Sequence, residues 1–204
     1  FHAEHGLGRP APWSAEAWRE RIASPVRACV DALAESGLVE DARVEALGRR
    51  VRARLDALGA RLEARRLEGR AVDGHGDVHL DHVWLEEGEP EPLLIDCLEF
   101  DEDLRRIDAA SEVGFLAMDL RYRGAGALAE WFLAAYARRA DDYGLFGVVD
   151  FHAAYRALVR AKVAALAVGQ ESIAAAQREK ARASVERHLA LGESLLEADG
   201  PGEL

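Results

Sequence analysis

The sequence has few of the residues that stabilise secreted or membrane-embedded proteins. It contains two cysteines, Cys29 and Cys97, which lie far apart and in no CxxC spacing. This scarcity argues against a disulfide framework and against a thiolate metal site. There is also no run of about 18 apolar residues and no basic segment leading into an apolar one, so the sequence predicts neither a membrane span nor a signal peptide. We therefore expect a cytoplasmic protein.

Net positive charge is also lacking. The chain carries 37 acidic and 26 basic residues, a formal net charge of -11, and its sequence pI is about 5.1. A nucleic acid or an anionic membrane attracts a basic surface, so we expect neither as a partner. Half of the 204 residues are hydrophobic, and a chain of this length can bury a core as one domain or one large lobe.

Extended structure is predicted in one central stretch, residues 74–101, which reads GHGDVHLDHVWLEEGEPEPLLIDCLEFD. It contains two short apolar runs, and the acidic segment with glycine and proline between them is typical of a hairpin turn. Such a hairpin would bring Asp77 and His82 close to Asp96. Two carboxylates that face a common point are what a metal-assisted phosphoryl-transfer or hydrolytic centre needs.

Helical periodicity dominates the residues before this stretch. We predict a short helix from the N-cap Ser14 to Ile22 and a second one from Pro25 to about Gly37. Residues 41–66 carry apolar positions three or four apart and predict one long amphipathic helix. We interpret the arginines on its opposite face as solvated.

Four more helices are predicted after the central stretch, over residues 104–121, 127–140, 148–168 and 173–199, with a frayed tail at 200–204. In the first of them, Gly114 would let a neighbouring backbone approach closely. In the third, His152, Arg156 and Arg160 form a basic strip, interpreted as a surface face that pairs with nearby acids. The sequence therefore predicts a mainly α fold with one small β-hairpin.

One interpretation of the central stretch is a metallo-hydrolase. Residues 77–82 come close to the HxHxDH signature of the metallo-β-lactamase-like hydrolases, with Asp77 in the place of the first histidine. Such sites need further histidines from later strands. The downstream candidates, His152 and His188, fall in predicted helices, so this is the less favoured alternative.

The second interpretation is a phosphotransferase loop. His75 and Asp77 flank a glycine, His82 follows five positions after Asp77, and Asp96 ends the next predicted strand. In phosphoryl transfer one carboxylate orients the attacking hydroxyl and accepts its proton, while another helps to hold the divalent ion at the nucleotide phosphates. Asp77 is then the catalytic base, and Asp96 and His82 are the candidate metal ligands.

The segments HGDVHLDH and LLIDC resemble the aminoglycoside phosphotransferase and choline kinase group of kinase-like enzymes, whose loop reads HGDxHxxN and whose metal strand ends in IDF. The wider patterns IDCLEFDEDLRRIDAASEVGFLAMDL and YRALVRAKVAAL are similar to a branch of this group that is often encoded in one chain with a P-loop ATPase domain. The likeness runs from about Phe1 to about Leu195. It implies transfer of the γ-phosphate of ATP, with Mg²⁺, to a hydroxyl group of a small molecule.

The resemblance also implies roles for supporting residues. Asp108 and Glu112 match the paired acids of the DxAxDLA helix in this group. His75 and Asp108 would support the catalytic loop, Asp108 by accepting hydrogen bonds from the loop backbone. Glu99 and Asp101 lie in an acidic loop that could contact a cationic substrate such as an amine-bearing sugar.

Two features depart from the group. His82 stands where the group has asparagine, and an imidazole is a poor ligand for Mg²⁺, although acceptable to Mn²⁺. No segment before residue 74 resembles a Gly-rich nucleotide loop, a strand lysine or a P-loop. We therefore expect residues 1–204 to be the helical C-terminal lobe alone, inactive in isolation, with residues 1–3 resembling the helix that joins the two lobes.

A second functional class stays open. A catalytically degenerate lobe could serve as a binding or regulatory module for a fused ATPase. His82 favours that alternative, whereas Asp77 and Asp96 favour the enzyme.

Overall fold

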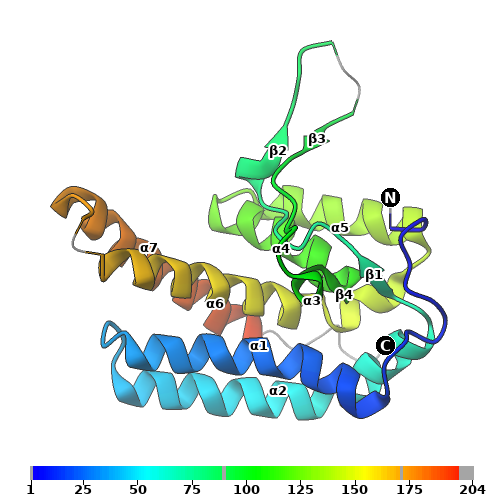
Figure 1. The fold of residues 1–204 in the computed structure, drawn as a ribbon, viewed down its shortest axis with the longest axis horizontal. Helices are drawn as coiled ribbons and strands as arrows, with labels where there is room; N and C mark the ends of the chain where they lie inside the picture. The colour runs from blue at the N-terminus through cyan, green and yellow to red at the C-terminus, as the bar shows by residue number, and fades with distance from the viewer. Residues whose placement is uncertain (1, 89–90, 171, 198–204) are drawn as a thin grey trace.

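The computed structural model describes residues 2–88, 91–170 and 172–197, and most of them are helical. The α-helices, in chain order, are α1 (Ala15–Glu35), α2 (Asp41–Leu67), α3 (Glu102–Arg105), α4 (Ala109–Tyr122), α5 (Gly126–Ala140), α6 (Val149–Val168) and α7 (Ala175–Glu197). Figure 1 shows α1 and α2 side by side along one edge of the molecule. Helix α6 is central, because it packs against α1, α4 and α7.

Two small antiparallel sheets accompany the helices. In one, β2 (Val83–Trp84) pairs with β3 (Leu93–Leu94), and this is the predicted hairpin, which projects away from the helices (Figure 1). In the other, β1 (Ala71–Asp73) pairs with β4 (Arg106–Asp108). The mainly α fold and the hairpin are confirmed, but the second sheet was not predicted. The second sheet joins segments far apart in sequence, and three-residue strands are too short to give a periodic signal.

The helix predicted over residues 104–121 begins later than expected. The single turn α3 comes first, then β4, and α4 starts only after Asp108. The Asp108 carboxylate accepts a hydrogen bond of 2.7 Å from the amide of Ala110 and so caps α4. The backbone of residues 106–108 pairs with β1 and does not form helical hydrogen bonds. For this reason α4 cannot extend toward the N-terminus.

Helix α1 is continuous where two helices were predicted. Ser14 caps it as expected, accepting a hydrogen bond from the amide of Ala17. Pro25 lies inside it, although proline lacks the N–H that would bond one turn back. The chain stays helical because apolar side chains on both sides of the proline enter the core: Trp18, Ala23, Val26, Cys29, Val30 and Leu33.

The contact between α4 and α6 is close, as predicted from Gly114. A Cβ added there would lie 3.3 Å from the backbone nitrogen of Ala153. The interpretation of the α6 basic strip as a surface face is wrong for two of its members. His152 and Arg156 are 2% and 5% exposed, and only Arg160 is half-buried. Because α6 is covered by helices on several sides, its polar residues cannot all reach solvent.

The predictions for residues 41–66, 127–140 and 148–168 agree with α2, α5 and α6 to within one residue at each end. Residues 2–4 form a turn and not the expected helix, and Phe1, residues 198–199 and the tail predicted to fray lie outside the described residues. Among the described helices, none is long and apolar enough to cross a membrane.

A buried ion-pair network ties α2 to the start of α4. Arg65 donates to both carboxylate oxygens of Asp108 at 2.7–3.0 Å and to those of Asp142 at 2.7–2.9 Å. All three side chains are 3% exposed or less. Burial opposes ionisation of Asp108, but the Arg65 guanidinium holds the pKa of that carboxyl below its ordinary value. Arg65 is therefore an exception to the solvated arginines predicted for residues 41–66.

We predict that Asp108→Asn lowers the free energy of unfolding by about 1–3 kcal/mol, because it removes one of the two buried carboxylates that accept charged hydrogen bonds from Arg65. Asparagine still caps a helix, so the substitution isolates the loss of charge. Urea denaturation of the 204-residue chain measures the change. The control is Asp56→Asn, which removes the 72%-exposed partner of Arg19 and should cost less than about 1 kcal/mol. Equal losses in the two variants would contradict the network.

Candidate functional site

The loop from Gly74 to His82 carries the predicted catalytic residues and depends on glycine at two positions. A Cβ on Gly74 would lie 2.9 Å from Oε1 of Glu112, closer than real Cβ contacts. Gly76 has a φ of +82°, in the left-handed region that favours glycine, and a Cβ there would lie 2.8 Å from the side chain of Leu98. The loop is thus packed tightly between α4 and the segment that follows β3.

The backbone of this loop is held by Glu112. Its carboxylate accepts hydrogen bonds from the amides of His75 at 2.5 Å and Gly76 at 3.0 Å, and the residue is 3% exposed. The prediction that Asp108 plays this part is wrong, because the Asp108 carboxylate is occupied by Arg65 and by the start of α4. Glu112 lies one helical turn later, on the side of α4 that faces the loop.

His75 links the loop to the segment after β3. Its Nε2 lies 2.7 Å from the carbonyl oxygen of Ile95, and the amide of Asp77 donates to its Nδ1 at 3.3 Å. These partners select the tautomer in which Nε2 carries the proton. The structure therefore places His75 where its expected supporting role requires it.

His82 lies between the two predicted aspartates. Its Nδ1 is 2.9 Å from the carbonyl oxygen of Asp77 and therefore donates, which leaves the lone pair on Nε2. Nε2 is 3.3 Å from Oδ2 of Asp96, a residue with an unusual φ of +63°. A histidine that donates one ring N–H to a backbone carbonyl commonly binds metal through the other nitrogen. His82 and Asp96 are thus arranged to share a cation.

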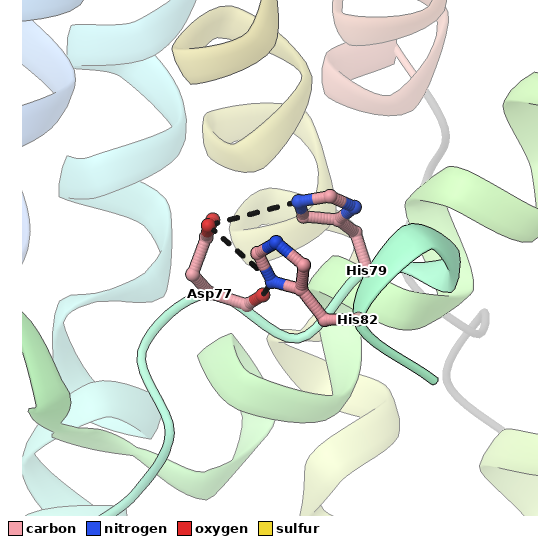
Figure 2. A group of neighbouring side chains, drawn as sticks. All are labelled: Asp77, His79 and His82. Atoms are coloured by element: carbon pink, nitrogen blue, oxygen red, sulfur yellow. Dashed lines mark hydrogen bonds and ion pairs between the residues drawn. The ribbon is translucent and has the colours of Figure 1, made fainter. Parts of the chain in front are cut away.

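A second donor set overlaps the first. Asp77, His79 and His82 each offer a ligand atom, and these atoms lie within 4.8 Å of one another. Figure 2 shows the Asp77 carboxylate facing both imidazoles, with His79 Nε2 and His82 Nδ1 each 3.6 Å from Oδ2. One carboxylate and two imidazoles suit Mn²⁺ or Zn²⁺ better than Mg²⁺.

His79 is the one member of this cluster without a role predicted from the sequence. It is 5% exposed and its ring lies 5.7 Å from that of Phe115, as a buried structural residue would. The close spacing of residues 77, 79 and 82 in one loop was the signal available in the sequence.

Asp77 is ionised at neutral pH. Burial opposes its charge, but the nearby His79, His82 and Arg156 outweigh burial and hold the pKa of the carboxyl below its ordinary value. An ionised carboxylate can accept a hydrogen bond from a substrate hydroxyl, which is the role predicted for Asp77.

The residues predicted to contact a cationic substrate lie on the exposed segment between β3 and α3. Glu99 and Asp101 are both exposed. Asp101 accepts a hydrogen bond of 2.9 Å from the amide of Asp103 and caps α3. Their substrate role stays a prediction.

No family model and no solved structure matches this chain. Among curated proteins it is 43% identical, over 122 residues, to uncharacterized proteins of Mycobacterium bovis (strain ATCC BAA-935 / AF2122/97) and of Mycobacterium tuberculosis, strains CDC 1551 / Oshkosh and ATCC 25618 / H37Rv. The matched segment is 60% of this chain and 23% of each relative. The chain therefore spans about a quarter of the length of these relatives.

We predict that Glu112→Gln loosens the loop of residues 74–82, because an amide side chain cannot accept hydrogen bonds from two adjacent N–H groups as a carboxylate does. The expected loss of unfolding free energy is about 1–3 kcal/mol. Hydrogen exchange at the amides of His75 and Gly76 should accelerate. The matched control, Glu45→Gln, alters a 74%-exposed carboxylate paired with Arg49 and should leave both measurements unchanged. Unchanged exchange in the Glu112 variant would contradict its assigned role.

Proposed function

We propose that this chain is the helical lobe of a small-molecule phosphotransferase that moves the γ-phosphate of ATP to a hydroxyl group of its acceptor. The observation that carries the proposal is the position of His82, which faces the ionised Asp77 on one side and Asp96 on the other. Phosphoryl transfer requires a base for the acceptor hydroxyl next to a site for the cation that binds the nucleotide phosphates.

Each residue of the loop has a distinct part in this proposal. Asp77 orients the acceptor hydroxyl and takes its proton. Asp96 and His82 hold the divalent cation, and a bound cation neutralises charge on the nucleotide phosphates. Glu112 and His75 keep the loop in the geometry that these roles need.

The imidazole of His82 shifts the expected metal preference. Mg²⁺ favours oxygen ligands, and Mn²⁺ accepts nitrogen more readily. We therefore propose Mn²⁺ as an alternative to Mg²⁺ in this protein. The sequence contains no Gly-rich nucleotide loop, so we propose that the groups clamping the triphosphate from the opposite side come from outside these 204 residues.

A second candidate function is a catalytically degenerate lobe that acts as a binding or regulatory module, for example for a fused P-loop ATPase. The observation that favours it is the identity of residue 82, a histidine at the position where the kinase-like group has asparagine, an oxygen ligand. The metallo-hydrolase alternative is weaker. Among the described residues neither His152, on α6, nor His188, on α7, joins the cluster of ligand atoms.

We predict that Mn²⁺ binds the 204-residue chain through Asp96 and His82. Electron paramagnetic resonance of free Mn²⁺ should show that Asp96→Asn and His82→Ala each weaken binding by at least about tenfold. His79→Ala is the matched control and should change the affinity by less than about threefold, since it removes an imidazole only from the overlapping set. The reverse order, with His79 essential and Asp96 dispensable, would place the ion in the set of Figure 2 and remove the support for a kinase-like metal site.

We also predict separate effects of the two aspartates on phosphoryl transfer, measured with the chain joined to the part that supplies the nucleotide clamp. Asp77→Asn should abolish turnover while the affinity for the metal–nucleotide complex stays within a few-fold, because a base acts on the acceptor and not on the nucleotide. Asp96→Asn should weaken that affinity itself. Normal turnover by the Asp77 variant would overturn the assignment of the base, and turnover by neither variant nor the parent would favour the degenerate module.

A further inference from the structure

A cavity is lined by residues of α1, α3, β4, α4 and α6. The space in it that the centre of a water-sized sphere can occupy is about 40 Å³, and the cavity opens to solvent. Trp18 and Ile22 of α1 form part of its apolar wall, and its charged lining consists of three arginines and two aspartates: Arg21, Arg106, Arg156, Asp103 and Asp108. Neither the loop chemistry nor the proposed function uses this cavity.

Almost every charge at the cavity has an ionic partner. Arg21 donates to Asp103 at 2.8 Å, Arg106 lies 2.7 Å from Glu102, and Asp108 is held by Arg65 at 2.7 Å. Each of these charges therefore has a partner of opposite sign within ion-pair distance. Arg156 is the exception.

Arg156 is a buried guanidinium without an ionic partner among the described residues. It is 5% exposed, and its Nε and Nη2 are buried without a hydrogen-bond acceptor in that part of the chain. Its guanidinium carbon lies 4.9 Å from the ring of Phe115 and 5.1 Å from that of Tyr155. Aromatic faces compensate part of the charge but accept none of its N–H bonds. A buried charge left in this condition is costly, and an anion is the partner that removes the cost.

His152 provides a second unsatisfied group on the same wall. It lies one turn before Arg156 on α6, is 2% exposed, and its Nε2 has no hydrogen-bond partner among the described residues. Burial lowers its pKa to about 4, so the imidazole is neutral at physiological pH. A neutral imidazole can donate one hydrogen bond without adding charge, and a guanidinium can donate several.

We propose that this cavity binds an oxyanion, the phosphate or carboxylate group of a small molecule, against Arg156 and His152. Water could accept the same hydrogen bonds, but water does not compensate the positive charge. The planar guanidinium presents paired N–H groups that match both kinds of oxyanion.

The position of Arg156 relative to the loop suggests which molecule carries the anion. Arg156 and His79 lie 4.9 Å and 5.7 Å from the same ring, that of Phe115, and Nε2 of His79 is 3.6 Å from the Asp77 carboxylate. The inner wall of the cavity is therefore near the proposed base. This step rests on the proposed phosphotransferase function. It makes the acceptor an anionic hydroxy compound, in contrast to the amine-bearing sugar expected from the exposed Glu99 and Asp101.

Inorganic phosphate is the probe for the site, titrated into the 204-residue chain at constant ionic strength with chloride as the balancing anion. The Nε–H resonance of Arg156, assigned by its loss in Arg156→Lys, should move saturably. Calorimetry should show that Arg156→Met weakens phosphate binding by at least about tenfold, and that Arg156→Lys retains it to within about fivefold. A parallel titration with malonate shows whether the site binds a carboxylate or a phosphate more tightly.

The matched control is Arg160→Met, which removes the same charge one turn further along α6, at a half-buried residue outside the cavity lining. It should leave phosphate affinity within about twofold, because a charge outside the cavity offers the bound anion no hydrogen bond. An unmoved Arg156 resonance, or equal losses in the Arg156 and Arg160 methionine variants, would overturn the site. If Arg156→Met fails to fold, the wild-type titration and the lysine variant still decide.

The inference that the acceptor is anionic is tested separately from the proposed function, by measuring KM. With the complete enzyme, Arg156→Met should raise KM for anionic acceptors and leave KM for ATP unchanged. Transfer only to uncharged or cationic acceptors, with KM insensitive to Arg156, would overturn the anionic acceptor but leave the phosphotransferase. Saturable phosphate binding with no transfer to any acceptor would instead overturn the phosphotransferase and leave the oxyanion site.

Discussion

The buried guanidinium of Arg65 is the interaction on which the rest of the site depends. It binds Asp108 and Asp142 with side chains that are almost fully removed from solvent, so neither carboxylate is free to move without leaving a charge unpaired. Asp108 then caps α4 and thereby sets where that helix begins. The end of α2 and the first turn of α4 are consequently fixed relative to each other.

The position of α4 in turn determines the loop. Glu112 is one turn into the helix, and its carboxylate accepts hydrogen bonds from the two backbone amides that precede Asp77. Gly74 and Gly76 allow that approach, because a side chain at either position would collide with the groups that hold the loop. Precise placement of a base by packed and hydrogen-bonded neighbours is a general requirement of catalysis. Here it is achieved by a carboxylate that itself touches no reacting group in the proposed mechanism.

Two basic side chains, those of His82 and Arg156, distinguish the proposed site from a loop that contains only acidic residues. The imidazole of His82 lies between Asp77 and Asp96, and the buried Arg156 adds a positive charge that helps to lower the pKa of Asp77. The chain is acidic overall, with a formal net charge of -11, so its surface alone would disfavour anionic ligands. A buried cation changes that balance locally, since charges interact more strongly where water is excluded.

The sequence by itself determined α2, α5, α6, the hairpin and the glycine-bearing loop, because each depends on residues that are neighbours along the chain. Apolar spacing predicts α2 and α6, and Gly114 predicts the close approach of α4 and α6. Only the tertiary structure decided that residues 106–108 form a strand, that Arg65 and not the loop is the partner of Asp108, and that Arg156 is buried. Strand pairing, buried ion pairs and the covering of a helix face bring together residues distant in the chain. A periodic pattern shows which side of a helix is polar, but not whether another element covers that side.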